Sequence, residues 1–259
     1  MNETRAPSIE HNPFARKIAA LGVLSGKEKA ILERLCRRQH RFEMHTDLMY
    51  QGQRIRRAYL LISGWANAYK MRPDGTRQII DIRVPGDFLG LQSILLHQSD
   101  YAIRPVIDMQ VAEIAIEDLF EVLVRSPRLA EAILWTVSQD SAAGAERLVS
   151  LGRRTATERI AHFMLELGAR LALVGHGDDT GYECPLTQYH LADALGLSAV
   201  HTNRVLRHLR DEGVLTFRDG HVLLDARDRL IALAGFDPAP LYLRRTTLPT
   251  AEFLKKLHL

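Results

Sequence analysis

The strongest constraint on the fold is the stretch 186–210, which reads LTQYHLADALGLSAVHTNRVLRHLR. Thr187 is suited to cap a helix whose apolar residues recur at helical spacing, and Gly196 supplies the left-handed residue that ends it. Ser198 is suited to cap a second helix directly afterwards. Two short helices joined through a glycine predict a helix-turn-helix, although such pairs also occur as plain helical hairpins in enzymes.

The second of these helices has two distinct faces. Its predicted inner positions are Thr202, Val205, Leu206 and Leu209. The opposite face is the one that a helix-turn-helix protein places in the major groove of DNA. The residues that we predict to contact DNA are Thr187, Gln188, Ser198, Ala199, Val200, His201, Asn203, Arg204 and Arg207.

Different contacts are expected from different members of this set. Arg204 matches the two acceptors on the major-groove edge of a guanine, whereas Ala199 and Val200 can meet at most a thymine methyl group. The predicted phosphate contacts, which position the helix without reading sequence, are Thr187, Ser198, His201 and Arg207.

A β-hairpin signal follows the helix pair. Asp219-Gly220 separates the apolar runs 214–217 and 222–224, and Asp-Gly between two such runs is typical of a tight hairpin turn. A helix-turn-helix followed by a hairpin is a winged helix, which favours DNA binding over a plain helical hairpin.

Composition sets further limits. The 259 residues, of which 46% are hydrophobic and 25% charged, are enough for two modest domains. There is no long apolar run and no secretory signal, so we expect a cytoplasmic protein with no membrane partner. The net charge of +3 is too small to argue for nucleic-acid binding, and two cysteines are too few for a four-cysteine iron–sulfur site.

The chain divides into four predicted parts. Short helices and then closely spaced β-prone segments with Gly corners predict a β-roll of jelly-roll type over 14–126, and a long helical period follows over 127–152. Thr155 is predicted to cap a helix to Leu173, and Asp225 to cap one that Gly235 ends. The winged domain spans 153–235 and a tail 236–259, so the fold class is α+β.

The long helix carries a stripe with alternating spacings of four and three residues, as in a coiled coil. The stripe, which we predict to form a dimer interface, consists of Ala130, Leu134, Val137, Ser141, Gly144, Leu148 and Leu151. A helix packed against its own domain is the alternative, because short heptad runs are common.

Four short motifs, taken with this order of parts, carry a family resemblance. They are LISG at 61–64, PGDFLG at 85–90, VAEI at 111–114 and RIA at 159–161. Over 14–224 the chain resembles the Crp/Fnr family of bacterial transcription regulators. The resemblance implies a homodimer in which a cyclic-nucleotide-binding-like β-roll senses a signal and two recognition helices read a near-palindromic DNA operator, with RNA polymerase as a further partner.

The expected effector pocket departs from the pattern of the family's cyclic-AMP-binding members. The positions at this pocket are Leu89, Gly90, Leu91, Ser99, Asp100 and Arg104. Leu91 stands where those members have a ribose-binding Glu, and Ser99-Asp100 where they have an Arg-Ser pair for the phosphate. Gly144-Ala145 replaces their Thr-Ser pair at the base. The sequence therefore argues against cyclic AMP as the effector, although Arg104 remains a candidate phosphate partner.

Other effectors stay open, and no cofactor is predicted. The candidate haem ligands are His40, His45 and His97, and Cys36 is a candidate redox switch with only Arg37-Arg38 to lower its pKa. An apolar ligand or a filled core would suit Leu89, Leu91, Ile94, Leu95 and Leu96. We expect a regulator and not an enzyme, with no catalytic and no metal-binding residues. The alternatives are a cupin-like metal enzyme and a ligand-binding module built on the β-domain.

Overall fold

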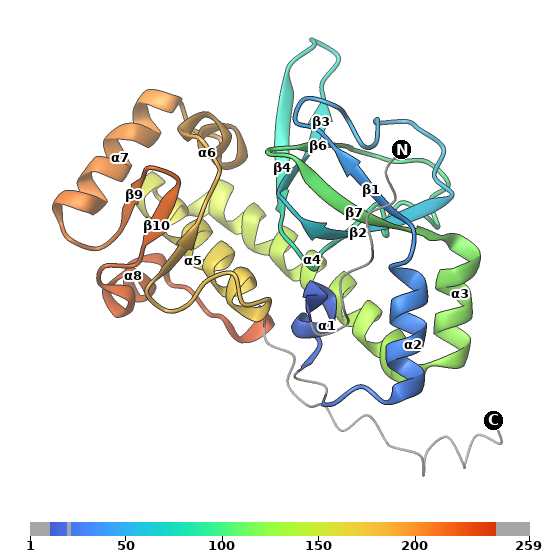
Figure 1. Cartoon of the computed structure of the whole chain (residues 1–259). Helices are drawn as coiled ribbons and strands as arrows, with labels where there is room; N and C mark the ends of the chain where they lie inside the picture. The colour runs from blue at the N-terminus through green and yellow to red at the C-terminus, as the bar shows by residue number, and fades with distance from the viewer. Residues whose placement is uncertain (1–10, 20–21, 242–259) are drawn as a thin grey trace.

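The computed structural model describes residues 11–19 and 22–241. Two antiparallel sheets form the predicted β-roll (Figure 1). One has the order β1-β7-β2-β5, from the strands Gln39–Phe42, Met109–Ala115, Arg57–Ser63 and Phe88–Leu89. The other has the order β4-β3-β6, from the strands Arg77–Arg83, Ala66–Met71 and Ala102–Pro105.

Three short helices pack beside the roll. They are α1 (Pro13–Lys17), α2 (Gly26–Leu35) and α3 (Ile116–Arg125). No element is predicted from the sequence over 117–126, so α3 is a helix that only the structure reveals. Leu119 and Val122 face the core, while Phe120 and Val124 are exposed. Ser126 ends this helix and also caps the next one, with its hydroxyl accepting from the Leu129 amide at 3.4 Å.

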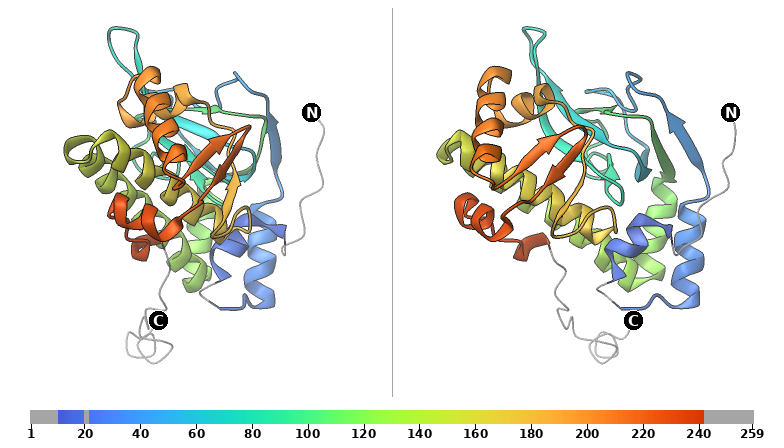
Figure 2. Two further views of the ribbon diagram at one scale, coloured as in Figure 1. Left: turned by 90° about the vertical axis from the view of Figure 1, so that its left-hand side faces the viewer. Right: turned by 60° about the vertical axis from the view of Figure 1, so that its left-hand side comes forward.

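The long helix α4 (Pro127–Arg153) connects the roll to the second domain (Figures 1 and 2). Arg154 then adopts an extended backbone, and Thr155 starts α5 (Ala156–Leu173). The predicted capping box is present, because the Thr155 side chain accepts from the Glu158 amide while Glu158 accepts from the Thr155 amide. Among the described residues, no helix is both long enough and apolar enough to cross a membrane.

The second domain is a winged helix built around α5. Its elements are β8 (Gly181–Glu183), α6 (Gln188–Leu195), α7 (Ala199–Asp211), β9 (Thr216–Arg218), β10 (His221–Leu223) and α8 (Arg227–Ala234). The strands form one sheet of order β8-β10-β9. The wing hairpin of β9 and β10 is where the sequence predicts it, whereas β8, the third strand of the sheet, was not predicted.

One predicted helix cap is wrong. Asp225 does not cap α8, which begins after Ala226 without a side-chain cap. Its carboxylate instead accepts a hydrogen bond of 2.8 Å from the Thr216 hydroxyl on the wing. Gly235 does end α8, as predicted.

The start of the predicted tail is part of the packed structure. Phe236 is buried and its ring meets that of His162 edge to face at 5.2 Å. A short 3₁₀ helix, Ala239–Leu241, lies on α4, where the Gln139 side chain donates to the Leu241 carbonyl at 2.7 Å. The rest of the tail, 242–259, lies outside the described residues.

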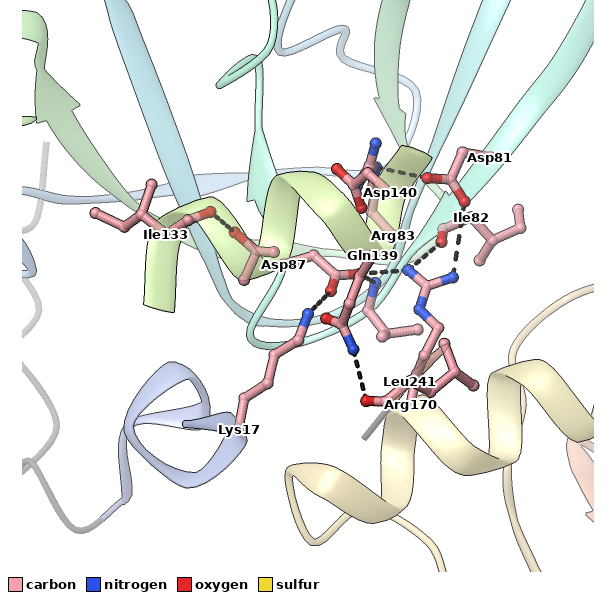
Figure 3. A network of polar contacts seen from close by, with 12 residues as sticks. Lys17, Asp81, Ile82, Arg83, Asp87, Ile133, Gln139, Asp140, Arg170 and Leu241 are labelled. Carbon is pink, nitrogen blue, oxygen red and sulfur yellow. Dashed lines mark hydrogen bonds and ion pairs between the residues drawn. The ribbon is translucent and has the colours of Figure 1, made fainter. Parts of the chain in front are cut away.

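The two domains share a core and a buried ionic cluster (Figure 3). Asp87, in the corner before β5, pairs with Lys17 of α1 at 2.7 Å and with Arg170 of α5 at 2.5 Å. The cluster joins Lys17, Arg83, Arg147 and Arg170 to Asp81, Asp87, Asp140 and Glu166, so its formal charges balance. This cluster holds α1, the roll, α4 and α5 against one another.

Candidate nucleic-acid interface and effector cavity

Local capping interactions build the helix-turn-helix. The Thr187 hydroxyl accepts from the His190 amide at 3.3 Å, and His190 Nδ1 accepts from the Thr187 amide at 3.0 Å. Gly196 has a φ of 64°, a left-handed conformation that favours glycine. The Ser198 hydroxyl then accepts from the His201 amide at 3.2 Å. The predicted start and end of the first helix and the predicted start of the second are therefore observed.

The inner face of α7 is buried as predicted. Thr202, Val205, Leu206 and Leu209 are all buried. The three apolar ones share one hydrophobic cluster with Leu191 and Leu195 of α6. The helix pair packs as one unit on its domain, which leaves the opposite face of α7 free.

The free face carries most of the residues predicted to contact DNA. Val200 is 72% exposed, and the other exposed members of the set are Thr187, Ser198, His201, Arg204 and Arg207. Ala199 is half-buried at the first position of α7. These side chains surround the N-terminal half of α7, the part of a recognition helix that meets base edges.

Two members of the predicted set bind each other. The Asn203 amide donates to the Gln188 side-chain oxygen at 2.8 Å, which ties α7 to α6. Both are half-buried. The neighbouring Tyr189 is 77% exposed on the same part of α6 and was not in the predicted set. An aromatic residue beside two predicted contacts was the signal available in the sequence.

The predicted dimer stripe lies on the exposed side of α4. Leu134 and Leu148 are 63% and 73% exposed. None of the stripe's members, Ala130, Leu134, Val137, Ser141, Gly144, Leu148 and Leu151, is buried. A different face of the same helix, with Leu129, Ala132 and Ile133, packs into the roll. Packing against its own domain therefore uses other residues of α4 and leaves the stripe uncovered.

A cavity of about 620 Å³ lies between the roll, α4 and α6. Gly144, Leu148 and Leu151 of the stripe lie along one wall, and Ala194 of α6 closes another. Of the six residues predicted for the effector pocket, only Asp100 lines this cavity. Tyr101, which was not among the predicted residues, also lines the cavity.

The other predicted pocket residues have partners or packing elsewhere. Leu89 is fully buried in the roll core, where Leu91 also packs, and Gly90 lies beside Met49. The Ser99 hydroxyl donates to the Tyr101 carbonyl at 2.5 Å. Arg104 donates to both carboxylate oxygens of Asp47, at 2.7 and 2.9 Å.

The charged groups of the cavity wall are already paired. Arg83 donates to both oxygens of Asp140 at 2.8 Å, and Arg147 pairs with Asp81 and, at 3.1 Å, with Glu166. Burial by itself raises the pKa of Asp81, but Arg147, Arg83 and a third arginine hold the pKa below its usual value. Both arginines therefore pair with the Asp81 carboxylate, which stays ionised.

The remaining effector candidates have ordinary surroundings. Burial raises the pKa of the Cys36 thiol to about 11, with Asn12 donating to the sulfur at 3.1 Å. The surroundings of Cys36 do not favour a redox switch, because a buried, protonated thiol is a poor nucleophile. His97 is exposed, and His40 lies 3.3 Å from Glu113. Within 11–19 and 22–241, no group of three or more His, Cys, Asp or Glu is arranged to hold a metal ion.

The sequence and the structure both match known proteins. Residues 158–233 match the model for a Crp-like helix-turn-helix domain, and 39–126 match that for a cyclic nucleotide-binding domain. The chain is 28% identical over 220 residues to the nitrogen fixation regulation protein FixK of Bradyrhizobium diazoefficiens, covering 85% of this chain and 91% of that protein. It is 24% identical to the fumarate and nitrate reduction regulatory protein of Salmonella typhimurium, covering 79% and 81%.

Solved structures agree. The structure of FixK2 from Bradyrhizobium japonicum superposes with a TM-score of 0.67 at 26% identity, covering 75% of this chain and 96% of that one. A CRP/FNR-family regulator from Thermus thermophilus, at 19% identity and a TM-score of 0.58, covers 76% and 98% and shares the fold. The protein described here is therefore a member of the Crp/Fnr family, a DNA-binding transcription regulator with an N-terminal β-roll and a C-terminal winged helix.

Proposed function

We propose that the protein acts as a homodimer on a near-palindromic operator, with α7 of each subunit in successive major grooves about 34 Å apart. The observation that carries this proposal is the pair of uncovered surfaces, the free face of α7 and the apolar stripe of α4. Leu134 and Leu148 would be costly to leave in water and suit a partner helix of a second copy. RNA polymerase is proposed as the further partner through which DNA binding becomes regulation.

Within this complex, Arg204 reads a guanine and the apolar Ala199 and Val200 meet at most a thymine methyl. Thr187, Ser198, His201 and Arg207 contact phosphates. Gln188 and Asn203 keep their mutual bond and hold the two helices in register at the DNA.

The β-roll is proposed to respond to an effector other than cyclic AMP. A cyclic phosphate needs a cation and hydroxyl donors. Arg83 and Arg147 at the cavity wall are bound to carboxylates, and Asp100 is an acid that pairs with Lys70 at 3.1 Å. A phosphate in the cavity would have to displace these carboxylates. A small molecule without net negative charge suits the wall better.

Selection of binding sites from a random duplex pool, with the purified full-length protein and no ligand, tests the main proposal. We expect a two-fold symmetric consensus whose half-sites lie about one DNA turn apart. Titration of the selected site at several salt concentrations should then separate the contacts. Arg207→Ala should weaken binding to all sequences and lower the salt slope by about one, since it removes one phosphate contact.

Failure to enrich any sequence with a folded dimer would contradict DNA binding by the free protein, and an asymmetric consensus would contradict the two-fold arrangement. Cyclic AMP is tested separately by thermal unfolding at saturating nucleotide. We expect no shift in Tm, and a dose-dependent rise would overturn the effector argument.

A further inference from the structure

The helix-turn-helix is attached to the β-roll at one edge strand. β4 is the outer strand of the sheet β4-β3-β6, and its open edge faces α6 (Figure 1). The Ile79 amide donates to Asp193 Oδ1 at 2.9 Å, and the Gln78 side chain donates to the Asp193 carbonyl. The Arg77 guanidinium lies 3.8 Å from the same carboxylate. Three consecutive residues of the roll therefore converge on one residue of the DNA-binding unit.

The contact is largely shielded from water. Ile79 is only 2% exposed, and the Asp193 side chain is 22% exposed. At the same end of α6, the Arg159 guanidinium donates to the Leu195 carbonyl at 2.7 Å. The C-terminal half of α6 is thus held between β4 and the start of α5, while its N-terminal half carries Thr187 toward solvent.

We propose that Asp193 is a positioning residue for DNA binding, through which the open edge of β4 fixes the helix-turn-helix in the orientation that meets the operator. Fixing α6 also fixes α7, because the two helices pack together and share the Asn203–Gln188 hydrogen bond. In this docked position Val200 and Arg204 remain exposed, so the contact does not cover the reading face. The inference rests on DNA reading by α7.

Electrostatics alone predicts that removal of Asp193 changes DNA affinity in the opposite direction from the positioning role. Asp193 is a negative charge on the DNA-reading unit, so removing it should tighten binding to a polyanion. The positioning role instead predicts that Asp193→Ala weakens binding, because the Ile79 amide loses its acceptor and the binding-competent orientation becomes less populated. Asp193→Asn removes the charge but keeps an oxygen for that amide.

The experiment compares operator affinity of the full-length variants by fluorescence anisotropy. We expect Asp193→Ala to bind about tenfold more weakly, and Asp193→Asn to stay within about twofold of the unaltered protein. The salt slope should be unchanged in Asp193→Ala, since no phosphate contact is lost. Asp211→Ala, which removes another acid from the same helix pair, is the matched control and should not weaken binding.

A second variant places the change in the other domain. Gln78→Ala should also weaken binding, and combining it with Asp193→Ala should cost less than the sum of the two effects, because both variants break the same contact. Equal tightening by Asp193→Ala and Asp193→Asn would overturn the proposal. So would tightening by Asp193→Ala alone, which would mean that the docked orientation is the inactive one.

Hydrogen exchange provides an arm that needs no DNA. The Ile79 amide should exchange faster in Asp193→Ala than in the unaltered protein or in Asp193→Asn. Sedimentation should show the same dimerisation in all three proteins. Unaltered exchange would show that the contact does not protect β4 and would overturn the proposal. If the unaltered protein bound no operator while Asp193→Ala still accelerated exchange of the Ile79 amide, the result would instead count against DNA reading by α7.

Discussion

Removal of Arg170 should cost more folding free energy than the removal of any exposed arginine. The Arg170 side chain is 8% exposed, and its guanidinium donates to Asp87 at 2.5 Å and to the Ile82 carbonyl at 2.9 Å (Figure 3). It also donates to Glu166 at 3.3 Å. Arg170→Met keeps much of the side-chain volume but removes one of the two cations paired with the buried Asp87 carboxylate, which leaves only Lys17. Breaking one side of such a pair costs about 3–5 kcal/mol.

The cost should depend on pH in a defined direction. Burial alone raises the pKa of Asp87, but Arg170 and Lys17 hold the pKa well below its usual range. In the unaltered protein this carboxylate therefore stabilises the fold above the unfolded pKa of about 3.9, and the contribution is lost only as pH falls further. Without Arg170 the pKa of Asp87 rises, so protonation removes a buried charge that is then paired only with Lys17. The difference between the two proteins should shrink from pH 7 to about pH 4.

Urea unfolding followed by tryptophan fluorescence, at one fixed protomer concentration, measures both effects. Arg227→Met is the matched control, because Arg227 pairs at 3.2 Å with an Asp179 that is 86% exposed. Such a surface pair is worth about 0–1 kcal/mol. The combination Arg170→Met with Asp87→Asn should recover part of the loss. A cost for Arg170→Met as small as that of the control, or one that grows on acidification, would refute the reasoning.

Four further outcomes are expected. Arg204→Ala should cost about 1–3 kcal/mol of operator binding and flatten preference at one half-site position, whereas equal losses on all duplexes would contradict guanine reading. Leu148→Glu should shift sedimentation from dimer toward monomer, and Leu233→Glu, on α8 and 38% exposed, should not. Burial and the charge of Arg154 lower the pKa of His162, so the free energy of unfolding should fall as pH drops below about 6.5. Urea titration at pH 7.5 and 5.5 should show a smaller fall in His162→Gln. Cys36, whose pKa burial raises, should react with iodoacetamide only after unfolding, and rapid alkylation of the native protein would contradict this.

The elements that the sequence predicts correctly depend on interactions between near neighbours. Thr155 reaches the amide of Glu158, and Ser198 reaches that of His201, within one helical turn. Gly196 and the Asp219-Gly220 turn satisfy local backbone requirements. These short-range interactions need no knowledge of the rest of the chain, which is why the helix-turn-helix, its wing and the start of α5 could be placed from sequence.

Competition from distant partners explains the errors. Asp225 is well placed to cap α8, but Thr216, across the wing, takes its carboxylate instead. The helix α3 follows β7 directly and is separated from α4 by Ser126 alone, so its apolar residues gave no clear boundary. In both cases a contact or a packing surface outside the segment decided the outcome.

The exposed face that we predict to contact DNA could be placed from the sequence because most of its residues lie on one short helix, α7, and its cap. The effector cavity and the attachment of α6 to β4 do not, because their groups come from distant segments. Arg83 meets Asp140 of α4, and Asp193 meets the edge of β4 at Ile79. Periodicity in the sequence indicates which side of a helix is apolar. Only the packed chain decides which charged groups lie opposite one another and what a strand edge pairs with, because the energies of these interactions depend on distance in space and on the exclusion of water.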